Sequence, residues 1–273
     1  MPRSIWTGVI SFGMVSVPVR LYTATESKDV SFRLLHKKDG TRLKQLRWCP
    51  TDEAEVEWSD IVRGYEYEKD QHVVLTDEDL AKLPLPSKHT IDLNAFVRAE
   101  EIDSIYYEKS YYLEPEETGR KPYALLMRAL QEKGLLAIAK IAIRNKERLC
   151  ALRPREGSLV LETLFFPDEI RAQQTSDSPE PDISDKELAM ANSLIDMMLE
   201  PFKPEDYVDE YRDALMKLIE AKLEGIELEE PAAPPKGKVI DLMSALKASV
   251  DKAKGRKGGE EQRRDQGRRK AAV

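Results

Sequence analysis

Apolar and polar residues alternate in short runs over the first third of the chain, as in strands with one buried face. Residues 5–13 and 15–22 are rich in β-branched and aromatic side chains and are separated by a short turn. Residues 30–35 and 43–48 have the same character and flank Asp39-Gly40, a pair typical of hairpin turns. The pattern therefore predicts two hairpins in this region.

Strand patterns return after a short helix. Thr76 is a candidate cap for a helix over residues 77–83, and Pro122 and Gly134 are suited to begin and end a second helix over 122–133. Further strands are predicted over residues 90–98, 104–113, 137–144, 148–153 and 158–166. The last three have tight connections, so we expect a barrel or a strongly curled sheet.

The periodicity changes to that of helices after Arg171. Residues 173–183 are polar, and Ser184 with Glu187 forms a capping box for a helix that runs to about Glu200. A second helix is predicted from Pro204 to Leu223. The apolar residues expected to pack on another subunit or on the rest of the chain are Tyr207, Tyr211, Leu215, Leu218 and Ile219.

A proline-rich linker precedes the last segment of the chain. Leu242, Leu246 and Val250 lie on one face of a short helix, which is expected to need a partner because so short a helix is marginal alone. The residues after it are polar and basic, and we expect a disordered cationic tail.

Charge is distributed unevenly. Residues 236–273 hold 12 Lys and Arg against 5 Asp and Glu, a net charge of +7, whereas residues 1–235 carry a net charge of −14. A basic arm on an acidic body is typical of nucleic-acid binding, but it is equally compatible with a tail that only keeps the protein soluble.

Other classes of function have little support in the sequence. There is no glycine-rich phosphate loop, no serine nucleophile elbow and no histidine or cysteine spacing typical of zinc, so we expect no enzyme, no cofactor and no metal. With two cysteines, no run of about 18 apolar residues and no secretory signal, we expect a cytoplasmic protein with no membrane partner. Nucleoid association is expected only from the family resemblance described next.

Five sequence blocks resemble the bacterial Ku family, in the family's order and at matching separations. They read IWTGVISFGMVSVPVRLYTAT at 5–25, SYYLEP at 110–115, KPYALL at 121–126, RNKERL at 144–149 and FPDEIR at 166–171. The resemblance covers residues 3–225 and extends to Ile240-Asp241-Leu242. Some family members have a Cys-x-x-Cys motif where this chain reads Cys49-Pro50-Thr51-Asp52, and the missing second cysteine supports the prediction of no zinc.

The resemblance implies a homodimeric ring, built on a β-barrel core with a helical arm, through which a double-stranded DNA end threads. It also implies recruitment of an ATP-dependent DNA ligase, ligase D, in non-homologous end joining. The expected fold is therefore mixed β and α. The expected segments are a barrel core with its DNA-encircling bridge at 1–172, the arm at 173–225, a linker at 226–238, and a short helix with a basic tail at 239–273.

A ring that accepts any DNA end must bind phosphates and not base edges, so its contacts should be Lys and Arg. The candidates in the body are Arg20, Arg33, Lys37, Lys38, Arg42, Lys44, Arg47, Arg144, Lys146, Arg148 and Arg153. Those in the tail are Arg256, Lys257, Arg263, Arg264, Arg268, Arg269 and Lys270. The apolar face of the short helix, at Leu242, Leu246 and Val250, is the candidate contact for ligase D.

Two alternatives stay open on the sequence alone. One is a DNA-processing nuclease, which would need a carboxylate–metal site. The other is a generic β-barrel interaction protein whose basic tail is incidental.

Overall fold

The computed structural model describes residues 3–83, 89–144, 146–173 and 182–226, together with Ala245, Ser249 and Val250. The chain divides into two compact units, residues 1–173 and 174–273.

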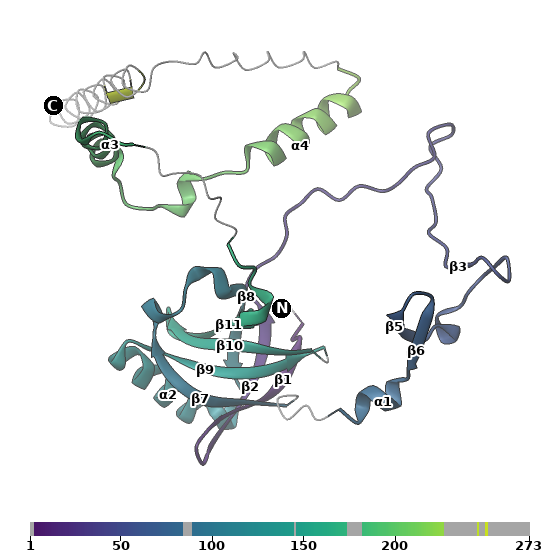
Figure 1. The fold of residues 1–273 in the computed structure, drawn as a ribbon, viewed down its shortest axis with the longest axis horizontal. Helices are drawn as coiled ribbons and strands as arrows, with labels where there is room; N and C mark the ends of the chain where they lie inside the picture. The colour runs from purple at the N-terminus through teal and green to yellow at the C-terminus, as the bar shows by residue number, and fades with distance from the viewer. Residues whose placement is uncertain are drawn as a thin grey trace. The chain divides into compact units, whose positions relative to one another are not determined.

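Seven strands of the first unit close into a barrel in the order β1-β2-β8-β11-β10-β9-β7 (Figure 1). All neighbouring pairs are antiparallel except β1 and β7, which are parallel and complete the ring. The prediction of a barrel with additional helices is confirmed. The strands are β1 (Trp6–Phe12), β2 (Val15–Thr23), β7 (Thr90–Arg98), β8 (Tyr107–Pro115), β9 (Leu135–Ile143), β10 (Lys146–Arg155) and β11 (Ser158–Leu164).

The parallel seam between β1 and β7 depends on a glycine. The amide of Val9 donates to the carbonyl oxygen of His89 at 3.0 Å. A Cβ on the preceding residue, Gly8, would overlap that same oxygen and the ring of Trp6. The barrel can close at this point because Gly8 has no side chain.

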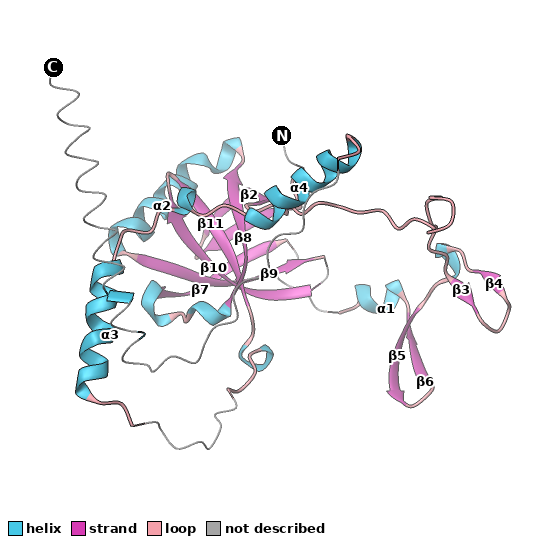
Figure 2. Ribbon diagram, turned by 90° about the horizontal axis from the view of Figure 1, so that it is seen from above, coloured by secondary structure: helices cyan, strands magenta, loops and turns pink. Residues whose placement is uncertain are grey.

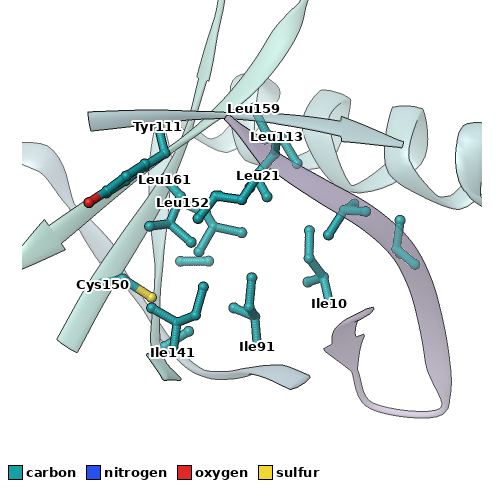
Figure 3. Close-up of a cluster of buried hydrophobic side chains, with 14 of the residues drawn as sticks. Ile10, Leu21, Ile91, Tyr111, Leu113, Ile141, Cys150, Leu152, Leu159 and Leu161 are labelled. Atoms are coloured by element: carbon teal, nitrogen blue, oxygen red, sulfur yellow. The ribbon is translucent and has the colours of Figure 1, made fainter. Parts of the chain in front are cut away.

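The barrel interior is a continuous apolar core (Figure 3). Ile10, Leu21, Ile141, Leu152 and Leu161 come from five different strands and are fully buried. Alternate residues of β2 are buried, which explains its period-2 pattern, whereas β11 is buried at six consecutive positions, Leu159–Leu164.

Helix α2 (Arg120–Lys133) packs against β2, β9 and β10 and adds Leu126 and Leu130 to this core. Its buried Tyr123 hydroxyl donates to the carbonyl oxygen of Leu113 and accepts from the amide of Leu159, both at 2.6 Å. The helix begins at Arg120, two residues before the expected start, and ends at Gly134, whose φ of 63° is left-handed as predicted.

Between β2 and β7 the chain leaves the barrel. We call residues 24–83 of this excursion the insert; none of them is buried. Its elements are β3 (Trp48–Cys49), β4 (Ala54–Glu55), β5 (Arg63–Glu68), β6 (Gln71–Leu75) and α1 (Asp77–Ala81), with β3 paired to β4 and β5 to β6.

Two predictions for the insert were wrong. Residues 30–35 and 43–48 do not form regular strands: the single bridge Leu35↔Arg42 joins them, and only Trp48 of the second run lies in a strand. The hairpin of β5 and β6 was not predicted at all. Residues 30–35 and 43–48 have the composition of strands, but they have no buried face against which a longer ladder of backbone hydrogen bonds could form.

The second unit contains α3 (Asp185–Met198) and α4 (Glu210–Leu223), which Figure 2 shows as separate helices. The capping box of Ser184 and Glu187 is present. The predicted start of the second helix at Pro204 was wrong, because Asp209 caps α4 by accepting from the amide of Arg212 at 2.9 Å. Pro204–Asp206 is a separate 3-10 turn, and Tyr207 therefore lies before the helix.

Candidate nucleic-acid interface

The insert presents most of its cations around one turn. The amide of His36 donates to the carbonyl oxygen of Thr41 at 2.8 Å, and Gly40 adopts a φ of 70°. The carboxylate of Asp39 accepts from the Thr41 amide at 2.9 Å and lies 3.1 Å from Nδ1 of His36. The Thr41 hydrogen bonds, with a further contribution from His36, lower the pKa of Asp39. The side chain of Asp39 therefore stabilises the turn.

The two segments that meet at this turn have unlike faces. Leu35 lies opposite Arg42, and the amide of Leu43 donates to the carbonyl oxygen of Leu34 at 2.9 Å. Around this single bridge residues two apart share a face, so Arg33, Arg42 and Lys44 fall on one side, together with Leu35 and Leu46. The alternate residues Phe32, Leu34 and Leu43 fall on the other. A groove of about 810 Å³ runs along these segments.

The cations of this turn are exposed and accessible to a ligand. Among the described residues, no ion pair involves Arg33, Lys37, Lys38, Arg42 or Lys44. Arg47 differs because its guanidinium lies 3.7 Å from the ring centroid of Trp58, which fixes the side chain and leaves its charge uncompensated.

The cations predicted on the barrel are mostly paired with carboxylates. Arg153 makes two bonds to Glu162, at 2.9 and 2.8 Å, and Arg148 is paired with Glu108. Two further pairs are more exposed: Arg20 lies 3.0 Å from Glu116, and Lys146 lies 3.1 Å from Glu169.

Their carboxylate partners make these barrel cations less available to the phosphates of DNA. Glu116, through its hydrogen bond and its charge, raises the pKa of Arg20. The amide of Phe166 and the ammonium of Lys146 lower the pKa of Glu169. A phosphate that contacted Arg20 or Lys146 would have to compete with a carboxylate already in place. The cations around the Asp39-Gly40 turn meet no such competition among the described residues, whereas Lys28, Arg63 and Lys82 elsewhere in the insert have carboxylate partners.

Arg144 differs from its neighbours on the barrel. It lies in the turn between β9 and β10 with a φ of 52°, a left-handed conformation uncommon for a residue with a Cβ, and it forms no ion pair among the described residues. Lys109 on β8, which no sequence pattern singles out, is also exposed and has no ion pair in the described parts of the chain. Lys109 and Arg144 line one cavity although they lie 35 residues apart, and such a juxtaposition is not visible in a single sequence.

The arm residues lie partly on a common helix. Leu215 and Ile219 are half-buried, whereas Tyr211 and Leu218 are 77% and 38% exposed. Tyr207 packs near Phe202, with ring centroids 5.5 Å apart. Ala221 is the one buried residue in the described part of this unit.

Most of the tail predictions lie outside the described residues. These are Leu242, Leu246, Arg256, Lys257, Arg263, Arg264, Arg268, Arg269 and Lys270. Val250 is described, is helical and is half-buried.

Within the described ranges, no group of three or more His, Cys, Asp or Glu side chains is arranged to hold a metal ion. No helix in those ranges is long and apolar enough to cross a membrane.

A closed seven-stranded barrel that carries a long, exposed insert with a cluster of cations at one turn defines a class of β-barrel proteins. Residues 11–190 match the family model described as "Ku70/Ku80 beta-barrel domain". The chain belongs to the Ku family, as the sequence blocks indicated.

Similar proteins have the name "Non-homologous end joining protein Ku". The protein from Symbiobacterium thermophilum is 48% identical over 91% of this chain and 62% of its own length. The one from Solibacter usitatus is 40% identical over 100% of both chains, and the one from Bacillus subtilis is 42% identical over 92% of this chain and 83% of its own. The chain spans less than two thirds of the Symbiobacterium relative.

Proposed function

We propose that this protein binds the ends of double-stranded DNA in non-homologous end joining, without sequence specificity. One observation carries the proposal: in a member of the Ku family, the exposed cations around the Asp39-Gly40 turn of the insert have no carboxylate partners among the described residues. They are Arg33, Lys37, Lys38, Arg42 and Lys44. Lys and Arg that are not compensated within the protein bind phosphates and release counterions whatever the base sequence.

The DNA-binding form is a homodimeric ring. Around the Asp39-Gly40 turn the insert exposes Phe32 (67%) and Leu34 (64%) on the side opposite its basic face, which carries Arg33 and Arg42. Two-stranded hairpins such as β5–β6 are marginally stable alone, so a second chain is the natural partner for these surfaces. In such a ring the basic faces line the channel and the apolar faces, with part of the arm around Tyr211, contact protein.

The protein acts as a scaffold and not as an enzyme. Ring closure holds the DNA, and the chain recruits or stimulates ATP-dependent DNA ligase D, which supplies the chemistry. The short helix that includes Val250 is the proposed ligase contact, and the basic tail gives accessory DNA affinity. The names of the relatives state an end-joining role and no catalytic activity.

Competition binding with three DNA substrates tests this proposal. A linear duplex, the same duplex with both ends blocked by bulky caps, and a closed circle of the same sequence are compared at one salt concentration. A threading ring binds the open duplex well and the other two poorly. Equal affinity for the circle and the linear duplex would contradict end binding.

The same preparation separates the alternatives. A nuclease would cleave labelled linear DNA in Mg²⁺ or Mn²⁺, with cleavage that copurifies with the chain. A generic interaction protein would bind no DNA once residues 236–273 are removed, whereas the proposed ring keeps its end preference without them and stimulates the ligase less.

A further inference from the structure

A second basic site lies at one end of the barrel, where β2 ends and the chain enters the insert. It is a cavity of about 580 Å³ lined by residues of β8, the β9–β10 turn, the start of β10 and the first residues of the insert. We call it the barrel-mouth pocket. Its volume is within the range of small-molecule sites.

The charged residues in the lining are all cations. Lys109, Arg144, Lys146 and Arg148 line the pocket, and no Asp or Glu does. Glu108 and Glu169 lie behind two of these cations and hold them in place, since Arg148 pairs with Glu108 and Lys146 with Glu169. Lys109 and Arg144 have no ion pair among the described residues, so their charges are available to a ligand.

Hydroxyl groups complete the lining. Thr23, Thr25, Ser27, Ser110 and Tyr111 all contribute to it. Ser27 already donates to Asp29 at 2.5 Å, whereas Tyr111 packs in the apolar core with its oxygen at the edge of the cluster (Figure 3). Burial raises the pKa of Tyr111, so its phenol stays protonated and can donate a hydrogen bond at neutral pH.

Backbone pairing holds these groups together. Thr23 of β2 is paired with Tyr111 of β8, and the amide of Ala24 donates to the carbonyl oxygen of Ser110 at 3.1 Å. Lys146 of β10 is paired with Ile143, so the β9–β10 turn that carries Arg144 is anchored at both sides. The paired strands of the barrel therefore position these donors on several sides of one cavity.

We propose that the barrel-mouth pocket binds a phosphate group. Several cations and neutral donors around a concave site suit a compact anion with many acceptor oxygens. A terminal phosphate carries more charge than an internal phosphodiester and can enter a pocket that the body of a duplex cannot. The phosphate comes either from a free anion or from the 5′ end of a DNA strand.

Calorimetric titration of the full-length protein with inorganic pyrophosphate tests the proposal. The wild type binds, and the double substitution Lys109→Gln/Arg144→Gln weakens binding about 10- to 100-fold, because it removes two charge-assisted hydrogen bonds. Both side chains are exposed and without ion pairs, so the fold is retained. The matched control, Lys121→Gln/Arg128→Gln on the exposed face of α2, binds as the wild type does.

The proposal is overturned if the wild type gives no heat of binding at pyrophosphate concentrations up to about 10 mM, because charge-assisted sites bind more tightly than that. Equal weakening in the control pair also overturns it, because the effect would then follow net charge. Neither result depends on DNA, so the proposed end-binding function can fail or succeed separately.

A second arm identifies the source of the phosphate. Affinities are compared for two linear duplexes that differ only in a 5′-phosphate or a 5′-hydroxyl. If the ligand is a DNA terminus, the wild type binds the phosphorylated duplex more tightly than the other duplex. The Lys109→Gln/Arg144→Gln variant then binds both duplexes with the same affinity. Pyrophosphate binding with no difference between the duplexes supports the pocket and assigns it to a free anion.

Discussion

The barrel and the insert belong to the same compact unit and use the same kinds of residue in different ways. Leu161 on β11 is fully buried, whereas Leu46 of the insert is 56% exposed. Arg153 on β10 is held by Glu162, whereas Arg33 of the insert has no ion pair in the described part of the chain. Most barrel residues find their partners within the chain, whereas the apolar and basic side chains around the Asp39-Gly40 turn of the insert stay exposed. Stability and binding should therefore respond to substitutions in different regions.

The largest expected effect is on the barrel core. Leu161→Ala should lower the free energy of unfolding by about 2–5 kcal/mol, because it removes a fully buried side chain and leaves a cavity. Leu46→Ala in the insert should change the free energy by less than about 0.5 kcal/mol in the monomer. Urea unfolding measures both. Similar losses would show that the insert is packed as firmly as the barrel.

The next effect is on DNA affinity. The triple substitution of Arg33, Arg42 and Lys44 by Gln should weaken binding of a linear duplex about 100-fold at moderate salt. It should also lower the salt slope by about 1 for each cation that no longer neutralises a phosphate. Fluorescence anisotropy over a range of salt concentrations measures both quantities.

The control replaces Lys121, Arg128 and Lys133 of α2 by Gln, which removes the same charge from the barrel unit. It should change affinity less than about threefold. If the two triple variants weakened binding equally, the insert would have no special role in DNA binding.

A smaller effect is expected at a paired barrel cation. Arg153→Met should lower the free energy of unfolding by about 1–2 kcal/mol, because it leaves the 9%-exposed Glu162 without its partner. Replacing Glu162 by Leu as well should recover most of the loss. DNA affinity should stay the same in folded Arg153→Met; an affinity about tenfold weaker would place Arg153 in the channel.

The smallest effect concerns pH and the turn of the insert. The Thr41 hydrogen bonds hold the pKa of Asp39 below its usual value of about 3.9. The stabilisation that ionised Asp39 gives to the turn is therefore complete above a pH of about 3.9. It is lost as the pH falls through the lowered pKa of Asp39 in the folded turn. An NMR titration of the Thr41 amide should give a midpoint below about 3.9. A midpoint at or above that value would show that the hydrogen bond does not persist in solution.

The sequence predicted the barrel well because its strands are apolar and compact, and strands such as β1 and β2 alternate between buried and more exposed residues around a single core. Ile10 and Leu21, for example, are both buried and both fit the alternation. It failed in the insert, where residues 30–35 have the composition of a strand but no packed face to align them. Periodicity reports burial, and in the insert no residue between 24 and 83 is buried.

The binding site was harder to predict for a related reason. The cation-rich turn around Asp39-Gly40 is local, so a single sequence reveals it. The pairing of Arg148 with Glu108 spans 40 residues and depends on strand register. Composition shows which residues are charged, but register decides which charges are already compensated.

Hydrogen exchange with mass spectrometry, on the full chain with and without DNA, tests the division of roles most directly. With a linear duplex, amides of residues 30–47 should become protected, while those of β9, β10 and β11 should stay as slow as in the free protein. With a duplex whose ends are both blocked, the protection of residues 30–47 should be absent. Protection that appears equally with blocked ends, or only in the barrel strands, would contradict end binding through the insert.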